Sequence, residues 1–325
     1  MGTLARLLPV LALLLLAAPL RADGLLPKEG DKIVFLGDTL TADGWDLPGG
    51  YVRLVVAGLQ AEGIHVTPIP AGVPGNPAKE QVRRLDPGLL DQQPNWVVLF
   101  PGQADVRAGV VPDDFHRSVF SLLDESQAKK ANILVVTAPP FSEEAAGTEA
   151  DRQLAAHNEF LRGLARERKY SLADAGALFA KALQADPPAP GTRLLTVPGG
   201  GHLNPAGNRL VALAILQAWG VPSVDFAKIE AAWDAIPAAA SLGTGFQPVA
   251  VPLTFAQYDA LARAAQARHL NADGLAAVLY GEAVREVLQA RPKDAANLSL
   301  LQYEIQKRFA DKVTAAASGI KPPPK

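Results

Sequence analysis

Two separate segments of the chain carry residue types that can perform acyl transfer. Residues 37–41 (GDTLT) contain Thr39, and residues 199–205 (GGGHLNP) contain His202. A threonine hydroxyl can attack a carbonyl carbon, and an imidazole can accept the proton that this attack releases. Each residue also has a plainer interpretation, because a threonine oxygen can cap the start of a helix and a loop histidine can simply face solvent.

The hydropathy pattern around these segments predicts a layered α/β domain that positions them. Short apolar runs, expected as strands, lie at residues 32–36, 65–69, 96–100, 133–137 and 170–173. Amphipathic stretches separate them, and this alternation favours a parallel sheet with helices on both faces. In such sheets, ligands bind beyond the carboxyl ends of the strands. The loops after the first three strands, beginning with the loop that holds Thr39, are therefore expected to form the site.

Four short blocks, in order along the chain, resemble the signature blocks of the SGNH (GDSL-type) hydrolase and esterase family. They are Gly37-Asp38-Thr39-Leu40, residues 71–76 with Gly75, Gly102-Gln103-Ala104-Asp105, and residues 199–202. The resemblance covers about residues 31–220. It implies a flavodoxin-like three-layer α/β/α fold with a mainly parallel five-stranded sheet. It also implies hydrolysis of small acyl esters or acetylated carbohydrates by a serine nucleophile. No cofactor and no metal are expected, since the sequence has no phosphate-binding loop and no zinc motif.

The resemblance assigns roles to positions of this chain and shows three departures from the family pattern. Thr39 stands where the family has its nucleophilic serine, and Ala104 where it has the asparagine that donates to the oxyanion. Gly199 stands where it has the aspartate that orients the catalytic histidine, which His202 matches. The backbone N–H groups of Thr39 and Gly75 match the remaining oxyanion donors. The other residues expected to line the cleft are Asp38, Asn76, Gln103 and Asp105, the last in a structural role.

These departures weaken the catalytic interpretation. One oxyanion donor is typically worth about 10²- to 10³-fold in rate, and the triad carboxylate about 10⁴-fold. Because triad members act as a unit, the loss of one makes the others contribute little. The sequence favours an esterase-like protein, weakly active or inactive, that binds an acyl, acetyl or carbohydrate ligand. The alternative is an active, divergent carbohydrate acetyl-ester hydrolase that uses Thr39 and His202, with a carboxylate supplied from elsewhere in the chain.

Composition and charge exclude several other classes of protein. The formal net charge of −2 and the pI of about 6.2 provide no electrostatic footprint for nucleic acid. The chain has no cysteine, which excludes disulfides, thiolate metal sites and a cysteine nucleophile. No oligomeric state is indicated.

Both ends of the chain differ in composition from the α/β region. Residues 1–22 are expected to be a signal peptide, with Arg6, an apolar stretch over residues 7–20 and cleavage after Ala22. That stretch is shorter than the roughly 20 residues of a bilayer span, so export to the periplasm or the extracellular space is expected, without stable membrane insertion after cleavage. An uncleaved anchor is the alternative.

Residues 226–316 are expected to form an Ala-rich helical extension, followed by a disordered tail over residues 317–325. Thr254 and Gln257 form the sequence pattern of a capping box, which predicts the start of a helix. A third hypothesis for the function is therefore an interaction module that acts through these helices.

Overall fold

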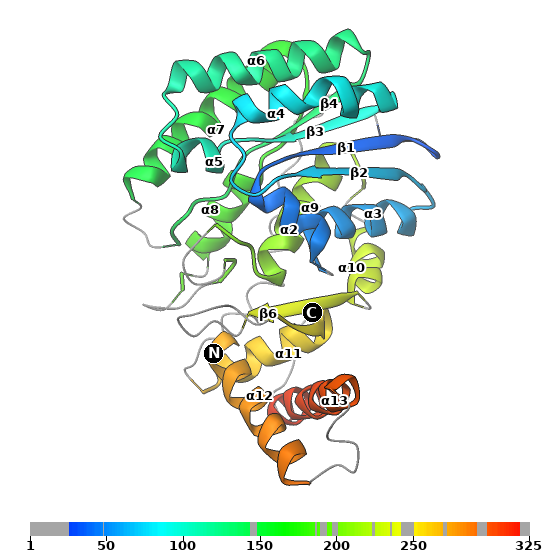
Figure 1. Cartoon of the computed structure of the whole chain (residues 1–325), viewed down its shortest axis with the longest axis vertical. Coiled ribbons are helices and arrows are strands. Elements are labelled where there is room, and N and C mark those ends of the chain that lie inside the picture. The colour runs from blue at the N-terminus through cyan, green and yellow to red at the C-terminus, as the bar shows by residue number, and fades with distance from the viewer. Residues whose placement is uncertain are drawn as a thin grey trace. The chain divides into compact units, whose positions relative to one another are not determined.

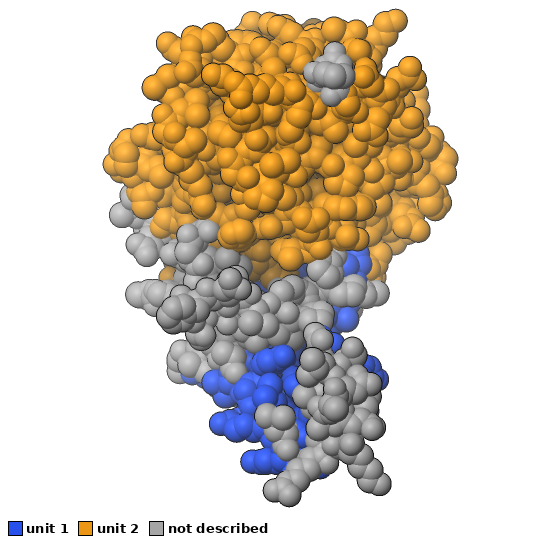
Figure 2. Space-filling view, in the orientation of Figure 1, with its two compact units in different colours: residues 1–13, 234–325 blue, residues 14–233 orange. Residues whose placement is uncertain are grey.

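The computed structural model describes residues 26–47, 49–143, 148–185, 187–188, 194–196, 201–222, 225–234, 236–241, 250–268, 272–290 and 298–318. The expected signal peptide, Gly199 and residues 319–325 of the expected tail lie outside these ranges. The chain divides between Trp233 and Asp234 into an α/β unit and a C-terminal unit, orange and blue in Figure 2. Among the described helices, none has both the length and the hydropathy of a membrane span.

The α/β unit is built on a five-stranded parallel sheet, as the sequence predicts (Figure 1). Its strands are β1 (Lys32–Gly37), β2 (Thr67–Gly72), β3 (Trp96–Phe100), β4 (Asn132–Val136) and β5 (Ser171–Ala173). The order in the sheet is β2-β1-β3-β4-β5. β2 begins two residues later than expected and contains Pro68 and Pro70, which an edge strand tolerates because one side of its backbone has no partner strand.

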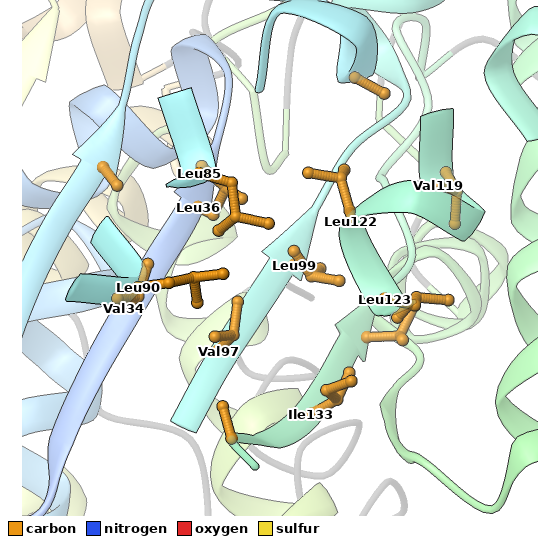
Figure 3. Close-up of a cluster of buried hydrophobic side chains, with 14 of the residues drawn as sticks. Val34, Leu36, Leu85, Leu90, Val97, Leu99, Val119, Leu122, Leu123 and Ile133 are labelled. Atoms are coloured by element: carbon orange, nitrogen blue, oxygen red, sulfur yellow. The ribbon is translucent and has the colours of Figure 1, made fainter. Parts of the chain in front are cut away.

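Helices cover both faces of the sheet. Alternate strand residues point to opposite sides, so the apolar side chains on each side need a covering layer. On one face, Val34 and Leu36 pack with Val97 and Leu99 against buried side chains of the covering helices (Figure 3). These helices are α4 (Ala78–Arg84), α6 (Pro112–Ala128) and α7 (Glu149–Arg168). A π-helical turn (Leu85–Leu89) and a 3₁₀ turn (Leu90–Gln92) follow α4.

The opposite face packs against α3 (Tyr51–Ala61), α8 (Ala175–Ala185) and α9 (Pro205–Ala218). The rings of Tyr51 and Phe100 meet edge to face with centroids 5.6 Å apart, and those of Trp96 and Trp219 with centroids 5.5 Å apart. Every residue of β3 is buried, which explains its continuous apolar sequence. The three-layer α/β/α arrangement is thereby confirmed.

Two short helices that the hydropathy pattern did not predict follow β1 and β3. They are α2 (Thr39–Asp46) and α5 (Gln103–Arg107). The cap of α2 is Asp38 and not Thr39, since the Asp38 carboxylate accepts a hydrogen bond from the Leu40 N–H (3.1 Å). With eight residues, two threonines and a glycine, α2 has too little length and helix propensity to be recognised from periodicity.

Close packing against the ends of the strands, and not intrinsic helix propensity, stabilises α2. A Cβ atom at Gly72, the last residue of β2, would lie 2.1 Å from the Ala42 nitrogen of α2. Glycine at this position therefore allows the helix to approach the strand closely.

The α/β unit extends further along the chain than the expected boundary at residue 220. Helix α10 (Phe226–Asp234) packs on α3, where the fully buried Trp233 donates its indole N–H to the Leu54 carbonyl (2.8 Å). Burial of a large aromatic side chain with a satisfied N–H ties α10 to this unit.

The C-terminal unit has its own buried core around Leu261 and Phe309. Its helices are α11 (Phe255–Gln266), α12 (Ala272–Gln289) and α13 (Leu298–Ala317). The capping box at the start of α11 is present, with Gln257 N–H donating to Thr254 Oγ1 (3.2 Å). An antiparallel pair of strands, β6 (Pro237–Ser241) and β7 (Ala250–Thr254), was not expected in this Ala-rich region. Pro237 and Pro252 disfavour a helix there.

Candidate functional site

The carboxyl ends of β1 and β2 bring Thr39 and Gly75 together, as expected. Thr39 is the first residue of α2, and its Oγ1 accepts a hydrogen bond from the Gly75 N–H (3.0 Å). Gly75 has φ of +69°, a left-handed backbone conformation that glycine adopts without strain, and a Cβ atom there would meet nothing within 4 Å. The Gly75 N–H therefore points at the hydroxyl that stands in the nucleophile position.

Asp38 and Ala104 connect α2 to α5 beneath this hydroxyl. The buried Asp38 carboxylate accepts hydrogen bonds from the N–H of Leu40 (3.1 Å) and from the N–H of Ala104 (2.9 Å). Burial raises the pKa of Asp38. Because the Ala104 N–H is engaged and its side chain is a methyl group, residue 104 offers no donor to an oxyanion.

Gln103 does not replace the missing asparagine. Its side chain is buried, and its Nε2 donates to the carbonyl of Pro139 (2.9 Å). A buried amide that already has a backbone acceptor would lose that bond if it turned toward a substrate. From the predicted set of oxyanion donors, the backbone N–H groups of Thr39 and Gly75 remain as candidates.

Asp105 and Asn76 hold the neighbouring loops. Asp105 Oδ1 accepts from the Ala78 N–H (3.0 Å), while its buried Oδ2 has no hydrogen-bond partner among the described residues. Burial raises the pKa of Asp105 to about 6. Asn76 Oδ1 accepts from Arg84 Nε (2.9 Å). Both contacts position the start or the end of α4, which is consistent with a structural role.

His202 pairs with a carboxylate that the family resemblance did not identify. Its Nδ1 lies 2.5 Å from Oδ2 of Asp43, on α2. The Asp43 hydrogen bond raises the pKa of His202, although burial and the charge of Arg107 oppose it. Asp43 is four residues after Thr39, so the two side chains share one face of α2. Asp43 thus places His202 beside the helix face that carries Thr39.

The geometry leaves the second ring nitrogen of His202 available for proton transfer. With Nδ1–H donated to Asp43, Nε2 is the acceptor nitrogen of the neutral ring. No hydrogen bond among the described residues engages Nε2, and none joins His202 to the Thr39 hydroxyl. Thr39, His202 and Asp43 carry a hydroxyl, an imidazole and a carboxylate, the three chemical groups that a hydroxyl-nucleophile mechanism uses.

Sequence reasoning missed Asp43 because the family pattern directs attention to Gly199. Asp43 and His202 are 159 residues apart in the chain, so no local spacing connects them. The available signal was the Thr-x-x-x-Asp spacing over residues 39–43, which has meaning only if that segment is a helix.

A second carboxylate, that of Glu143, holds the segment that precedes the His202 loop. Glu143 is buried, and its Oε1 accepts hydrogen bonds from Leu195 N–H (3.0 Å), Thr196 N–H (2.6 Å) and Thr196 Oγ1 (2.6 Å). Its Oε2 accepts from Leu194 N–H (2.5 Å). Thr196 in turn forms an antiparallel bridge with Leu203, the neighbour of His202. Glu143 therefore positions the His202 loop from the segment that follows β4.

In the part of the chain that the structure describes, no group of three or more histidine, aspartate or glutamate side chains is arranged to hold a metal ion.

The chain is similar to known esterases over the α/β unit. Residues 35–210 match the family model described as GDSL-like Lipase/Acylhydrolase family. An acetylxylan esterase of Geobacillus stearothermophilus is 28% identical over 188 residues, which cover 50% of this chain and 83% of that protein.

Solved structures agree with this match. The acetyl xylan esterase AlAXEase is 27% identical, with a TM-score of 0.53 over 57% of this chain and 98% of that one. LAE5, an α/β hydrolase from the metagenome of Lake Arreo in Spain, has a TM-score of 0.53 over 60% of this chain and 97% of that one. At 20% identity, LAE5 supports the fold alone.

Proposed function

Since the chain belongs to the GDSL-like lipase/acylhydrolase family, we propose that it hydrolyses small acyl esters with Thr39 as nucleophile and His202 as general base. The observation that carries this proposal is the 2.5 Å contact between His202 Nδ1 and Asp43 Oδ2. It supplies a carboxylate in place of the family's aspartate, a position that Gly199 occupies in this chain. The contact favours the active alternative over the inactive protein that the three departures suggested.

The proposed reaction follows the two-step route of hydroxyl nucleophiles. Thr39 Oγ1 attacks the acyl carbon while its proton passes to His202 Nε2. The resulting oxyanion accepts hydrogen bonds from the N–H groups of Thr39 and Gly75, so the Gly75 N–H moves from the hydroxyl to the oxyanion. The intermediate then expels the alcohol, which takes the proton from His202. Water, deprotonated by His202, attacks the acyl-Thr39 ester and releases the acid.

The proposed enzyme is slow. Ala104 supplies no oxyanion donor, which corresponds to a rate loss of about 10²- to 10³-fold. The extra methyl group of Thr39, compared with serine, restricts its rotamer and crowds the acyl carbon. Because two of the similar proteins are named as acetylxylan esterases, acetylated carbohydrate is the first substrate class to test. The composition of residues 1–22 supports export before the enzyme acts.

A second candidate function is ligand binding without turnover. It is favoured by the Thr39 hydroxyl, which accepts a hydrogen bond from Gly75 where a nucleophile ready for attack would donate one to His202. The same backbone donors would then hold the carbonyl of an acetyl group that is never cleaved.

The third hypothesis, an interaction module, concerns the C-terminal unit alone. That unit has its own core, which supports independent folding. A chain that ends after Trp233 tests this, because an intact and fully active truncated protein would be consistent with a separate role for the missing unit.

Hydrolysis of 4-nitrophenyl acetate and of acetylated xylo-oligosaccharides distinguishes the first two candidates. We expect wild-type activity above background, none in Thr39→Ala, and a higher rate in Thr39→Ser. Thr67→Ala, a change at an exposed threonine of the edge strand β2, is the matched control. Undiminished hydrolysis in Thr39→Ala would overturn the proposed mechanism. Inactivity of all variants, Thr39→Ser included, would favour ligand binding.

A further inference from the structure

A cationic side chain lies beside the His202 loop and has no role in the reaction described above. Arg107 is the last residue of α5, and its side chain is exposed. Its Cζ lies 5.1 Å from the centroid of the Phe141 ring. A Cβ atom at Gly201 would lie only 1.8 Å from Arg107 Nη2, so the guanidinium rests on Gly201, the residue before His202.

The acidic side chains of the site do not neutralise this cation. Within the described residues, Arg107 forms no ion pair and no hydrogen bond with another side chain. The Asp38 oxygens accept from two backbone N–H groups, and Asp43 is paired with His202. Arg107 does influence both His202 and Asp38 electrostatically, which places its charge within range of the reacting groups.

The contact with the Phe141 ring occupies none of the N–H donors of the Arg107 guanidinium. A guanidinium that lies against an aromatic ring keeps its N–H donors at its edges. Two parallel N–H groups of arginine match the two oxygens of a carboxylate, and such charge-assisted pairs are stronger than neutral hydrogen bonds. A carboxylate is therefore the substituent that Arg107 is best suited to bind.

We propose that Arg107 binds a carboxylate of the substrate, so that the preferred substrates are acetyl esters of acidic sugars. This proposal rests on the proposed ester hydrolysis and specifies its substrate class. The acid group of a uronic acid unit would pair with Arg107 while its acetyl ester lies between Thr39 and His202. Neutral acetylated sugars have no carboxylate to pair with Arg107, so its guanidinium stays solvated.

A matched pair of substrates tests the assignment. Methyl 2-O-acetyl-glucuronide and methyl 2-O-acetyl-glucoside differ only in a carboxylate that replaces a hydroxymethyl group. We expect wild type to favour the acidic ester in kcat/KM by about tenfold, as one charge-assisted pair supports. The preference should disappear in Arg107→Gln and persist in part in Arg107→Lys. Arg166→Gln, a change at an exposed arginine of α7, should leave the preference intact.

Two outcomes would overturn the assignment: no preference in wild type, or an unchanged preference in Arg107→Gln. Calorimetric binding of methyl glucuronide and methyl glucoside to Thr39→Ala protein separates this inference from the proposed function, since these sugars carry no ester. Failure of every ester assay, with glucuronide binding that weakens about tenfold when Arg107→Gln is added, would reject the hydrolysis and retain the carboxylate site. Hydrolysis without any preference would reject the carboxylate site alone.

Discussion

The Asp43 carboxylate pairs with the imidazole of His202, with Oδ2 and Nδ1 2.5 Å apart. Asp43 comes from α2, whereas the family pattern places the orienting carboxylate a few residues before the histidine. The nucleophile position and the carboxylate therefore lie on one helix, a single turn apart. Any displacement of α2 would change the positions of both groups together.

Replacement of Asp43 should impair hydrolysis and change its pH dependence. We expect Asp43→Asn to lower kcat by about 10²- to 10⁴-fold, because the imidazole loses its orientation and the stabilisation of its charged form. The Asp43 hydrogen bond raises the pKa of His202, so its removal should lower that pKa. Since the base must be neutral, the acid limb of the pH–rate profile should move to lower pH. Rate measurements and an NMR titration of His202 check both effects.

Asp46→Asn is the matched control, since Asp46 is exposed at the end of the same helix. An unchanged pKa of His202 in Asp43→Asn would show that the pair does not exist in solution.

Removal of the Glu143 carboxylate should release the His202 loop. Glu143→Ala leaves three backbone N–H groups and one hydroxyl without their acceptor, and we expect a loss of roughly 3 kcal/mol in the free energy of unfolding. Hydrolysis should fall in parallel, and the pKa of His202 should decrease as the ring leaves Asp43. Urea denaturation and the NMR titration measure the two effects.

Glu143→Gln should recover most of both properties, because Oε1 alone accepts three of the four hydrogen bonds. Glu149→Ala, at an exposed glutamate, controls for loss of charge. A Glu143→Ala protein with normal activity and a normal pKa of His202 would contradict a positioning role.

The buried His157 should make stability depend on pH in the acidic range. His157 lies against Phe115, with ring centroids 3.9 Å apart, and burial together with the charge of His116 lowers its pKa to about 4. Its unfolded-state pKa is about 6.5, so the folded protein favours the neutral ring. The stability that the neutral His157 ring contributes is fully present above pH 6.5, and it is lost as the pH falls toward 4. Urea midpoints should decrease over this range, and by less in His157→Gln.

The matched substitution for His157 is His65→Gln, at a histidine whose side chain is 63% exposed. An equal decrease of the urea midpoint in wild type and in His157→Gln would assign the pH dependence to other groups.

The raised pKa of Asp105 should make the free energy of unfolding depend on pH in the opposite direction from His157. Burial raises its pKa to about 6, above its ordinary value of 3.8, so the folded state favours the protonated acid. The stability associated with the protonated form is present below pH 3.8 and is lost as the pH rises through 6. The stability of Asp105→Asn relative to wild type should therefore increase from about pH 4 to about pH 8. Thermal denaturation at both pH values measures the difference.

Asp91→Asn, at an exposed aspartate, provides the comparison for Asp105→Asn. A relative stability of Asp105→Asn that stays constant or decreases with pH would show that the Asp105 carboxyl is ionised without penalty in the folded protein.

The centre of the sheet could be predicted from the sequence because β1, β3 and β4 are buried on both faces. Residues 96–100 have no polar member, and such a run has few alternatives to a central parallel strand. The same pattern locates the segments that carry Thr39 and Gly75, since parallel strands end at one edge of the sheet.

The partners of His202 could not be predicted in the same way. Helix α2 is short and contains Gly44, so its packing against β1 and β2 decides its conformation and only the folded chain reveals Asp43. Glu143 and Arg107 likewise act through contacts with segments far away in the chain. A resemblance between motifs assigns roles only to positions that match the family's motif. It therefore cannot identify a carboxylate that a different helix contributes.

Detection of an acyl-enzyme on Thr39 tests the proposed mechanism most directly. The protein is mixed with 4-nitrophenyl acetate, quenched in acid, digested and analysed by mass spectrometry. We predict an acetyl group on Thr39 in wild type, less of it in Asp43→Asn and none in Thr39→Ala. Continued hydrolysis with no acetyl group on Thr39, at the same rate in Thr39→Ala, would contradict the assignment of Thr39 as the nucleophile.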